Sequence, residues 1–303
     1  MSVDAAAPLE TPVWFGPLRE PAWLLPRLRA DAPTIVFAAE RWREPGVDGD
    51  GRDLRLGLPL YLAEAARFGT NARALASREA VDPDDPPRQG VVTVRSAVAP
   101  EGQPSMRLRA FDTQGVPLDE IVRDAHDPVT LGGALGALLH AVTQASASSG
   151  VRPIWNSLYS LPSGAALTSY VRGQHAAVRV TDEALPETAQ VDALSERRGD
   201  VRAVLTSLGA LATSASEPFP ALLFFGALAA AADARSSVVG EFRLQANARC
   251  MTATDPLDPV YSIAMLVMHL FGDRAAAERR AEALRATGDE RVTRWVARVR
   301  GEG

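Results

Sequence analysis

Short apolar runs separated by turn residues predict a sheet in the first half of the chain. Residues 34–39 form such a run of β-branched and aromatic side chains, which predicts a buried strand. Residues 105–112 alternate apolar and polar positions, which is typical of a half-buried antiparallel strand. The Pro- and Gly-containing segment 100–104 predicts a hairpin between this strand and the one before it. The complete set of predicted strands is 34–39, 73–76, 90–98, 105–112 and 116–123.

Two helices accompany these strands. The first is predicted over residues 56–68, ending at Gly69, and the second from Pro128 to residue 142. The segment 44–53 is rich in glycine and aspartate and is expected to be an exposed loop. These elements predict an α+β fold in which a small mixed sheet carries its helices on one face.

Apolar positions recur at helical spacing through most of the second half. The segments with this periodicity are 165–180, 187–197, 200–214, 221–232, 239–252, 259–271, 274–286 and 289–300. They predict an all-helical, repeat-like domain, although no fixed repeat period can be laid over it.

We therefore expect three regions: an N-terminal arm over 1–30, an α+β module over 31–152 and a helical domain over 153–303. The arm is rich in proline and contains Trp14 and Trp23, whose large rings gain most when buried. We expect it to pack on the body of the molecule, or to clasp a second copy in a homodimer.

The basic residues exclude several classes of enzyme. The chain has 303 residues and 32 basic ones, and every basic residue is an arginine. Walker-type phosphate loops, protein kinases and Schiff-base enzymes all need a lysine. This arginine usage is also typical of a GC-rich bacterial coding sequence.

Cysteine and histidine are too sparse for the common metal and nucleophile sites. The single cysteine, Cys250, has no nearby general base and is expected to be a small buried hydrophobe. His140 and His269 fall in apolar helical runs, where a core or interface histidine is expected. Asp48 and Asp50 resemble part of a calcium loop, but the spacing of the required ligands fails. We predict no metal, no cofactor and no catalytic residue.

The charge and hydropathy argue against nucleic-acid and membrane partners. The net charge is −5, and acidic residues accompany the arginine clusters. The longest apolar run, 219–232, is shorter than the roughly 18–20 residues that span a membrane. The first residues lack the basic and apolar regions of a secretory signal, so we expect a cytoplasmic protein.

Residues 89–94 and 107–118, followed by the helix 129–142, resemble the TolB amino-terminal-like domain in their order of elements. In bacterial regulatory proteins this domain is often followed by tetratricopeptide-like helices, and segments 166–175 and 272–278 are similar to the openings of such repeats. The resemblance implies a non-catalytic module that contacts a peptide or another protein. It implies no catalytic residue.

The favoured hypothesis is therefore a non-catalytic protein- or peptide-binding accessory or scaffold protein of a bacterial regulatory or peptide-processing pathway. Binding is expected at the domain junction, or by strand addition to a sheet edge near residues 91–98. Aromatic and arginine side chains gather near the junction and are the candidate ligand-binding residues: Arg152, Trp155, Tyr159, Tyr170 and Arg172. The alternatives are that these aromatics form a core between the two domains, and that the protein is a hydrolase or transferase of unrecognised type.

Overall fold

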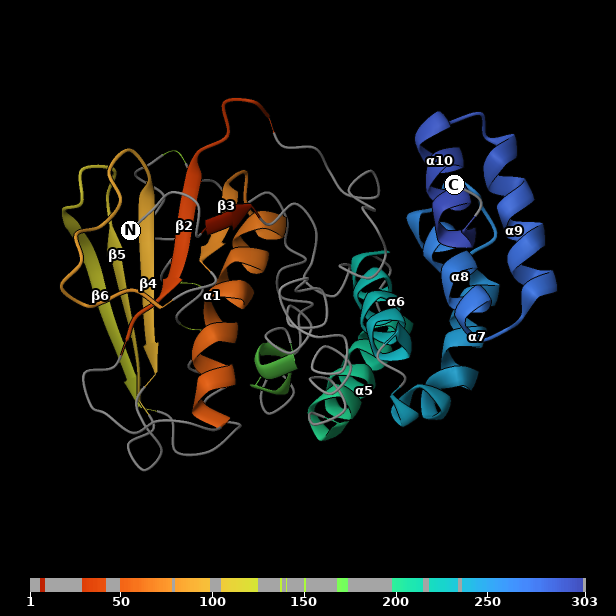
Figure 1. The fold of residues 1–303 in the computed structure, drawn as a ribbon, viewed down its shortest axis with the longest axis horizontal. Coiled ribbons are helices and arrows are strands. Elements are labelled where there is room, and N and C mark those ends of the chain that lie inside the picture. Colours follow the sequence, from red (N-terminus) through yellow and green to blue (C-terminus); the bar gives the residue numbers. More distant parts are fainter. Residues whose placement is uncertain are drawn as a thin grey trace. The chain divides into compact units, whose positions relative to one another are not determined.

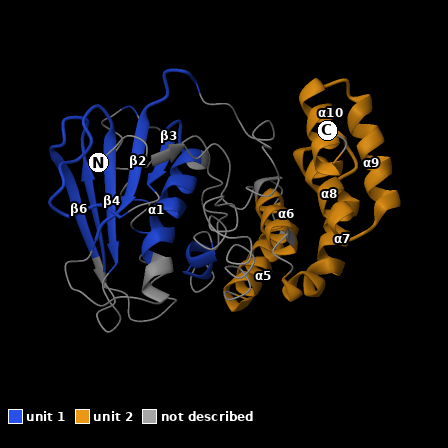
Figure 2. Ribbon diagram, in the orientation of Figure 1, with its two compact units in different colours: residues 1–10, 28–175 blue, residues 11–27, 176–303 orange. Residues whose placement is uncertain are grey.

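The computed structural model confirms an α+β fold with a helical C-terminal part (Figure 1). It describes residues 6–8, 29–41, 50–77, 80–98, 105–124, 137, 140, 150, 168–173, 198–214, 218–233 and 236–301. The chain divides into two compact units (Figure 2). Unit 1 comprises Met1–Glu10 and Leu28–His175, and unit 2 comprises Thr11–Arg27 and Ala176–Gly303.

The sheet of unit 1 is mixed and has the strand order β1-β3-β2-β4-β5-β6. Its strands are β1 (Ala6–Pro8), β2 (Thr34–Ala39), β3 (Arg73–Ser77), β4 (Val92–Val98), β5 (Ser105–Phe111) and β6 (Pro117–Asp124). β2 lies parallel to both β3 and β4, whereas β4, β5 and β6 form an antiparallel meander. The five predicted strands are thereby confirmed, and β1 adds a short strand from the N-terminal arm.

The position of β4 corrects one prediction. We expected a free sheet edge near residues 91–98, but β4 pairs with β2 on one side and with β5 on the other. Such an interior strand is buried on both faces, and six of the seven residues of β4 are buried, Arg95 among them. Among the described strands the edges of the sheet are β1 and β6.

Helix α1 (Asp50–Gly69) packs on one face of the sheet, against β2, β3 and β4 (Figure 1). The predicted helix is confirmed, but it begins earlier than expected, because Asp50–Asp53 were assigned to a loop. The segment 42–49 lies outside the described residues.

A short helical segment over residues 168–173 packs closely on α1. Tyr170 is fully buried, its ring meets Tyr61 edge to face at 6.4 Å, and its hydroxyl donates a hydrogen bond to Glu64. These contacts place the segment in unit 1, which extends to His175. The expected boundary between residues 152 and 153, and most of the predicted helix 128–142, lie outside the described residues.

The described part of unit 2 is built from helices, as predicted. They are α5 (Arg198–Ser214), α6 (Pro218–Asp233), the 3-10 helix η6 (Ser237–Phe242), α7 (Arg243–Thr252), α8 (Pro259–Leu270), α9 (Arg274–Ala286) and α10 (Glu290–Arg300). The apolar α6 packs against α5 and α8, and α9 packs against α8 and α10. No helix in the described part of the chain is both long and apolar enough to cross a membrane.

Cys250 is buried at the end of α7, as predicted. Arg280 from α9 donates hydrogen bonds to the carbonyl oxygens of Cys250 and Ala253 at 2.6 and 3.0 Å, and its guanidinium lies 4.2 Å from the centre of the Tyr261 ring. Arg280 therefore satisfies the C-terminal carbonyl groups of α7. His140 and His269 are both exposed, so neither is a core histidine, and the alternative of an interface histidine stays a prediction.

Candidate functional site

A group of arginines lies on one face of the central strands of unit 1. The register of β4 and β5 places Arg95 opposite Arg109 and Ala97 opposite Arg107. Since side chains alternate between the two faces of a strand, these three arginines project from the same face. The opposite face of β5 carries Met106, Leu108 and Ala110, all of them buried.

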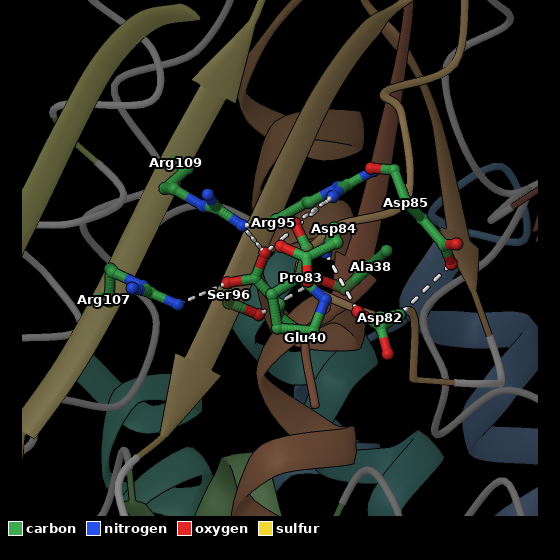
Figure 3. A network of polar contacts seen from close by, with 10 residues as sticks. All are labelled: Ala38, Glu40, Asp82, Pro83, Asp84, Asp85, Arg95, Ser96, Arg107 and Arg109. Carbon is green, nitrogen blue, oxygen red and sulfur yellow. Dashed lines mark hydrogen bonds and ion pairs between the residues drawn. The ribbon is translucent and has the colours of Figure 1, made fainter. Parts of the chain in front are cut away.

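The three guanidinium groups surround the carboxylate of Glu40 (Figure 3). Arg107 Nη2 lies 2.9 Å from Glu40 Oε2, Arg109 Nη2 bonds to Oε1, and Arg95 Nη1 lies 3.9 Å from Oε1. Glu40 follows β2 directly and is held in the sheet by a hydrogen bond from its N–H to the carbonyl of Ser96. We call Glu40, Arg95, Arg107 and Arg109 the arginine cluster.

The loop after β3 closes over one side of the arginine cluster. Arg95 Nη2 donates a 2.6 Å hydrogen bond to the carbonyl oxygen of Asp85, and Arg109 Nη2 donates one of 3.2 Å to that of Pro83. Arg95 is 4% exposed, and burial lowers its pKa because it penalises the charged form. The negative charge of Asp85 opposes this shift.

The geometry ties three strands of the sheet together. Glu40 at the end of β2 reaches Arg107 and Arg109 on β5, across β4, which lies between them. Both carboxylate oxygens are engaged by arginines, so Glu40 is arranged as a charged anchor. Two of these arginines also contact an aromatic ring. The centre of the Phe111 ring lies 5.4 Å from the guanidinium carbon of Arg95 and 5.7 Å from that of Arg109.

The edge strand β6 provides a second candidate site. Its residues Leu118 and Val122 are 38% and 52% exposed, which is high for large apolar side chains in a sheet. Asp119 and Glu120 between them are also exposed. The turn before β6 is well ordered, because Asp112 Oδ1 accepts hydrogen bonds from the N–H groups of Gln114 and Val116, both at 2.8 Å.

The predicted ligand-binding residues are only partly described. Tyr170 belongs to the core of unit 1, and Arg172 is half-buried. Arg152, Trp155 and Tyr159 lie outside the described residues. The structure therefore brings no two of them together in a site among the residues that it describes.

Sequence reasoning missed the arginine cluster. The alternation in 105–112 indicated only a half-buried strand, and the polar positions of such a strand usually face solvent. Two signals were available: Arg95 interrupts an apolar strand, and Glu40 follows one directly. A charge in such a position needs a partner of opposite sign.

Neither a metal-binding group of side chains nor a similar protein gives further information about this site. Among the described residues, no group of three histidine, cysteine, aspartate or glutamate side chains is placed to hold a metal ion. No protein-family model matches the chain, and no curated protein matches it in sequence. The resemblance to the TolB amino-terminal-like domain therefore stays a prediction.

Proposed function

We propose that the protein is a non-catalytic peptide- or protein-binding protein that takes up an extended segment of its partner by strand addition to β6. The observation that carries the proposal is the exposure of apolar side chains on a strand at the sheet edge. An edge strand presents N–H and C=O groups of alternate residues to an incoming strand. An accessory or scaffold role in a bacterial regulatory or peptide-processing pathway fits such binding.

The side chains of β6 indicate the chemistry of the partner segment. Asp119 and Glu120 are exposed and would face cross-strand neighbours in an added strand, which favours arginine or lysine at those positions. Leu118 and Val122 favour apolar, β-branched or aromatic neighbours. The proposed partner segment is therefore extended and combines basic with apolar residues.

The test is a selection from a random peptide library on the immobilised full chain, followed by calorimetric titration of the enriched peptides. We expect basic residues to be enriched at two adjacent positions, opposite Asp119 and Glu120, with apolar residues on either side. The double variant Glu120→Lys with Val122→Lys should weaken binding by about tenfold or more, because it places like charges opposite the peptide.

Leu244→Lys is the control for the change at Val122, since it also places a lysine at an exposed apolar residue, here in unit 2. It should leave binding unchanged. If peptides bind but the double variant at β6 binds them as tightly as the unmodified chain, strand addition to β6 is wrong. If no peptide is enriched, the binding function itself is contradicted.

A further inference from the structure

Helix α7 buries its small side chains and leaves its large apolar ones outside. It packs against α5, α8 and η6, and its buried residues are Ala246 and Cys250, one turn apart. Leu244 and Met251 are 85% and 70% exposed, and Ala248 between them is exposed as well. At 3.6 residues per turn, these three positions lie on the side of the helix opposite Ala246 and Cys250. We call Leu244, Ala248 and Met251 the outer stripe of α7.

The outer stripe of α7 reverses the usual arrangement of a surface helix. Such a helix turns its large apolar side chains toward the core and its polar ones toward solvent. Single exposed apolar residues are common, but positions i, i+4 and i+7 form one continuous strip over two turns. The loop after α7 exposes a further leucine, Leu257, at 79%. This strip is therefore a candidate interaction surface.

The spacing along the outer stripe is symmetric about its centre. A two-fold axis between Asn247 and Ala248 would place Leu244 of one copy opposite Met251 of a second, antiparallel copy. The same axis repeats this contact at the other end of the stripe, as an interface between identical faces requires. The small Ala248 lies near the axis, where two helices approach each other most closely. The stripe is thus complementary to itself.

The charges at the two ends of α7 also suit an antiparallel copy. Arg243 at its start donates a hydrogen bond to a backbone carbonyl, and Asp255 after its end accepts one from a backbone N–H. Neither forms an ion pair with an opposite charge among the described residues. The other two charges nearby are engaged, because Glu241 pairs with Arg202 and the guanidinium of Arg249 bonds to a carbonyl oxygen of α5. In an antiparallel pair, the basic end of each helix would therefore meet the acidic end of the other.

We propose that the outer stripe of α7 is the interface through which two copies of this chain form an antiparallel, two-fold dimer. Both signs of charge flank the stripe, whereas an anionic membrane or a nucleic acid would be met by basic residues alone. A stripe of two turns is only about 10 Å long, so the dimer is weak and dissociates on dilution. This proposal goes beyond peptide binding at β6, which belongs to unit 1.

The test is sedimentation equilibrium of the full chain between about 1 μM and about 500 μM, a range that covers weak association. The mean molecular mass should rise from that of one chain toward that of two. Leu244→Lys should weaken this association by about tenfold or more, because it places a charge in the apolar contact. A chain that stays monomeric throughout would overturn the proposal.

Ala275→Lys is the matched control, since it adds the same charge at an exposed position of α9, outside the stripe. It should leave the association unchanged. Both positions are exposed, so both variants should fold. A dimer that Leu244→Lys leaves intact, or that both variants weaken equally, would overturn the proposal.

Cross-linking tests the antiparallel arrangement. The single native cysteine is buried, so it does not compete. Ala248→Cys, near the axis, should form a disulfide-linked dimer under mild oxidation. A mixture of Leu244→Cys and Met251→Cys chains should also be linked, whereas either chain alone should not, because about 10 Å of helix separates like positions. Linking of each chain alone as efficiently as the mixture would contradict the arrangement.

The same variants separate this proposal from strand addition to β6. Leu244→Lys should dissociate the dimer and leave peptide binding unchanged. The double variant Glu120→Lys with Val122→Lys should weaken peptide binding and leave the dimer intact. Loss of the dimer in that double variant would place the interface at β6 instead of α7.

Discussion

Burying the charge of Glu40 costs free energy, and its arginine partners offset that cost. A carboxylate that is 1% exposed loses nearly all of its hydration, and the arginines replace that hydration with charged hydrogen bonds. Removing its charge would leave the guanidinium groups of Arg95, Arg107 and Arg109 without their shared counter-ion. This asymmetry makes Glu40 more important for stability than an ordinary surface acid.

We therefore predict that Glu40→Gln lowers the free energy of unfolding by about 2–4 kcal/mol, somewhat less than for a fully buried pair because two of the arginines are partly exposed. Urea denaturation followed by circular dichroism measures this change. Glu241→Gln breaks an exposed ion pair with Arg202 and serves as the control, with little change expected. Similar effects of the two substitutions would contradict the anchoring role of Glu40.

Cys250 gives unit 2 a pH-dependent stability. Burial raises the pKa of its thiol to about 11, and the nearby charges of Arg280 and Arg249 oppose this shift only in part. An unfolded cysteine ionises near pH 8.5. Between these two pH values the unfolded chain releases a proton that the folded chain retains, so the free energy of unfolding falls as the pH rises.

The expected loss through this thiol is about 1–2 kcal/mol between pH 7 and pH 10. It is measured as the difference in the free energy of unfolding between the unmodified chain and Cys250→Ala at each pH, because the other groups titrate alike in both proteins. The chain has a single cysteine, so no second thiol contributes. If the two pH profiles run parallel, the thiol is not protected in the folded chain.

At the scale of elements, the packing of α1 against residues 168–173 depends on one glycine. A Cβ built on Gly57 would lie 2.0 Å from the carbonyl oxygen of Val171, which is backbone and cannot rotate away. Gly57→Ala should destabilise the chain by about 1–3 kcal/mol, since either helix must shift. Thermal unfolding measures the effect.

Gly199→Ala is the matched control for this change. Gly199 lies in α5, and a Cβ there meets no atom within 4 Å. Alanine favours the helix, so the control should be neutral or slightly stabilising. A destabilisation equal to that of Gly57→Ala would show that the close helix crossing is not the cause.

The sequence predicted an element correctly where the local pattern of side chains is enough to determine it. β2 covers the predicted residues 34–39, because a β-branched apolar run bounded by a proline permits little else. The first turn of α1 was missed, because glycine and aspartate favour loops. They are helical here because the helix that follows extends through them. β4 was placed at an edge, because strand order depends on pairing between distant segments, which no local pattern reports.

The arginine cluster could be predicted only in its parts. The polar alternation of β5 located Arg107 and Arg109 on one face of that strand. That this face meets Glu40 depends on the parallel pairing of β2 with β4, which brings residues about 70 positions apart together. Long-range register of this kind is not encoded in any short segment.

At the scale of the molecule, the two units have separate cores. Glu40 and its arginines lie in unit 1, whereas α6 and α8 form the apolar interior of unit 2. We predict that Glu40→Gln increases amide hydrogen exchange in β2, β4 and β5 and leaves α8 unchanged. Mass spectrometry of peptides from the full chain measures both regions in one sample. Equal acceleration in α8 would contradict independent cores.

The short pairing of β1 with β3 has a consequence for self-association. Ala6–Pro8 cover the outer side of β3, and trimming the first ten residues would leave that row of backbone groups open to any complementary strand, including β3 of another molecule. We therefore expect the trimmed chain to self-associate, which light scattering would detect as an increased mean molecular mass. Ala6–Pro8 then protect the edge of β3 from pairing with a strand of another molecule.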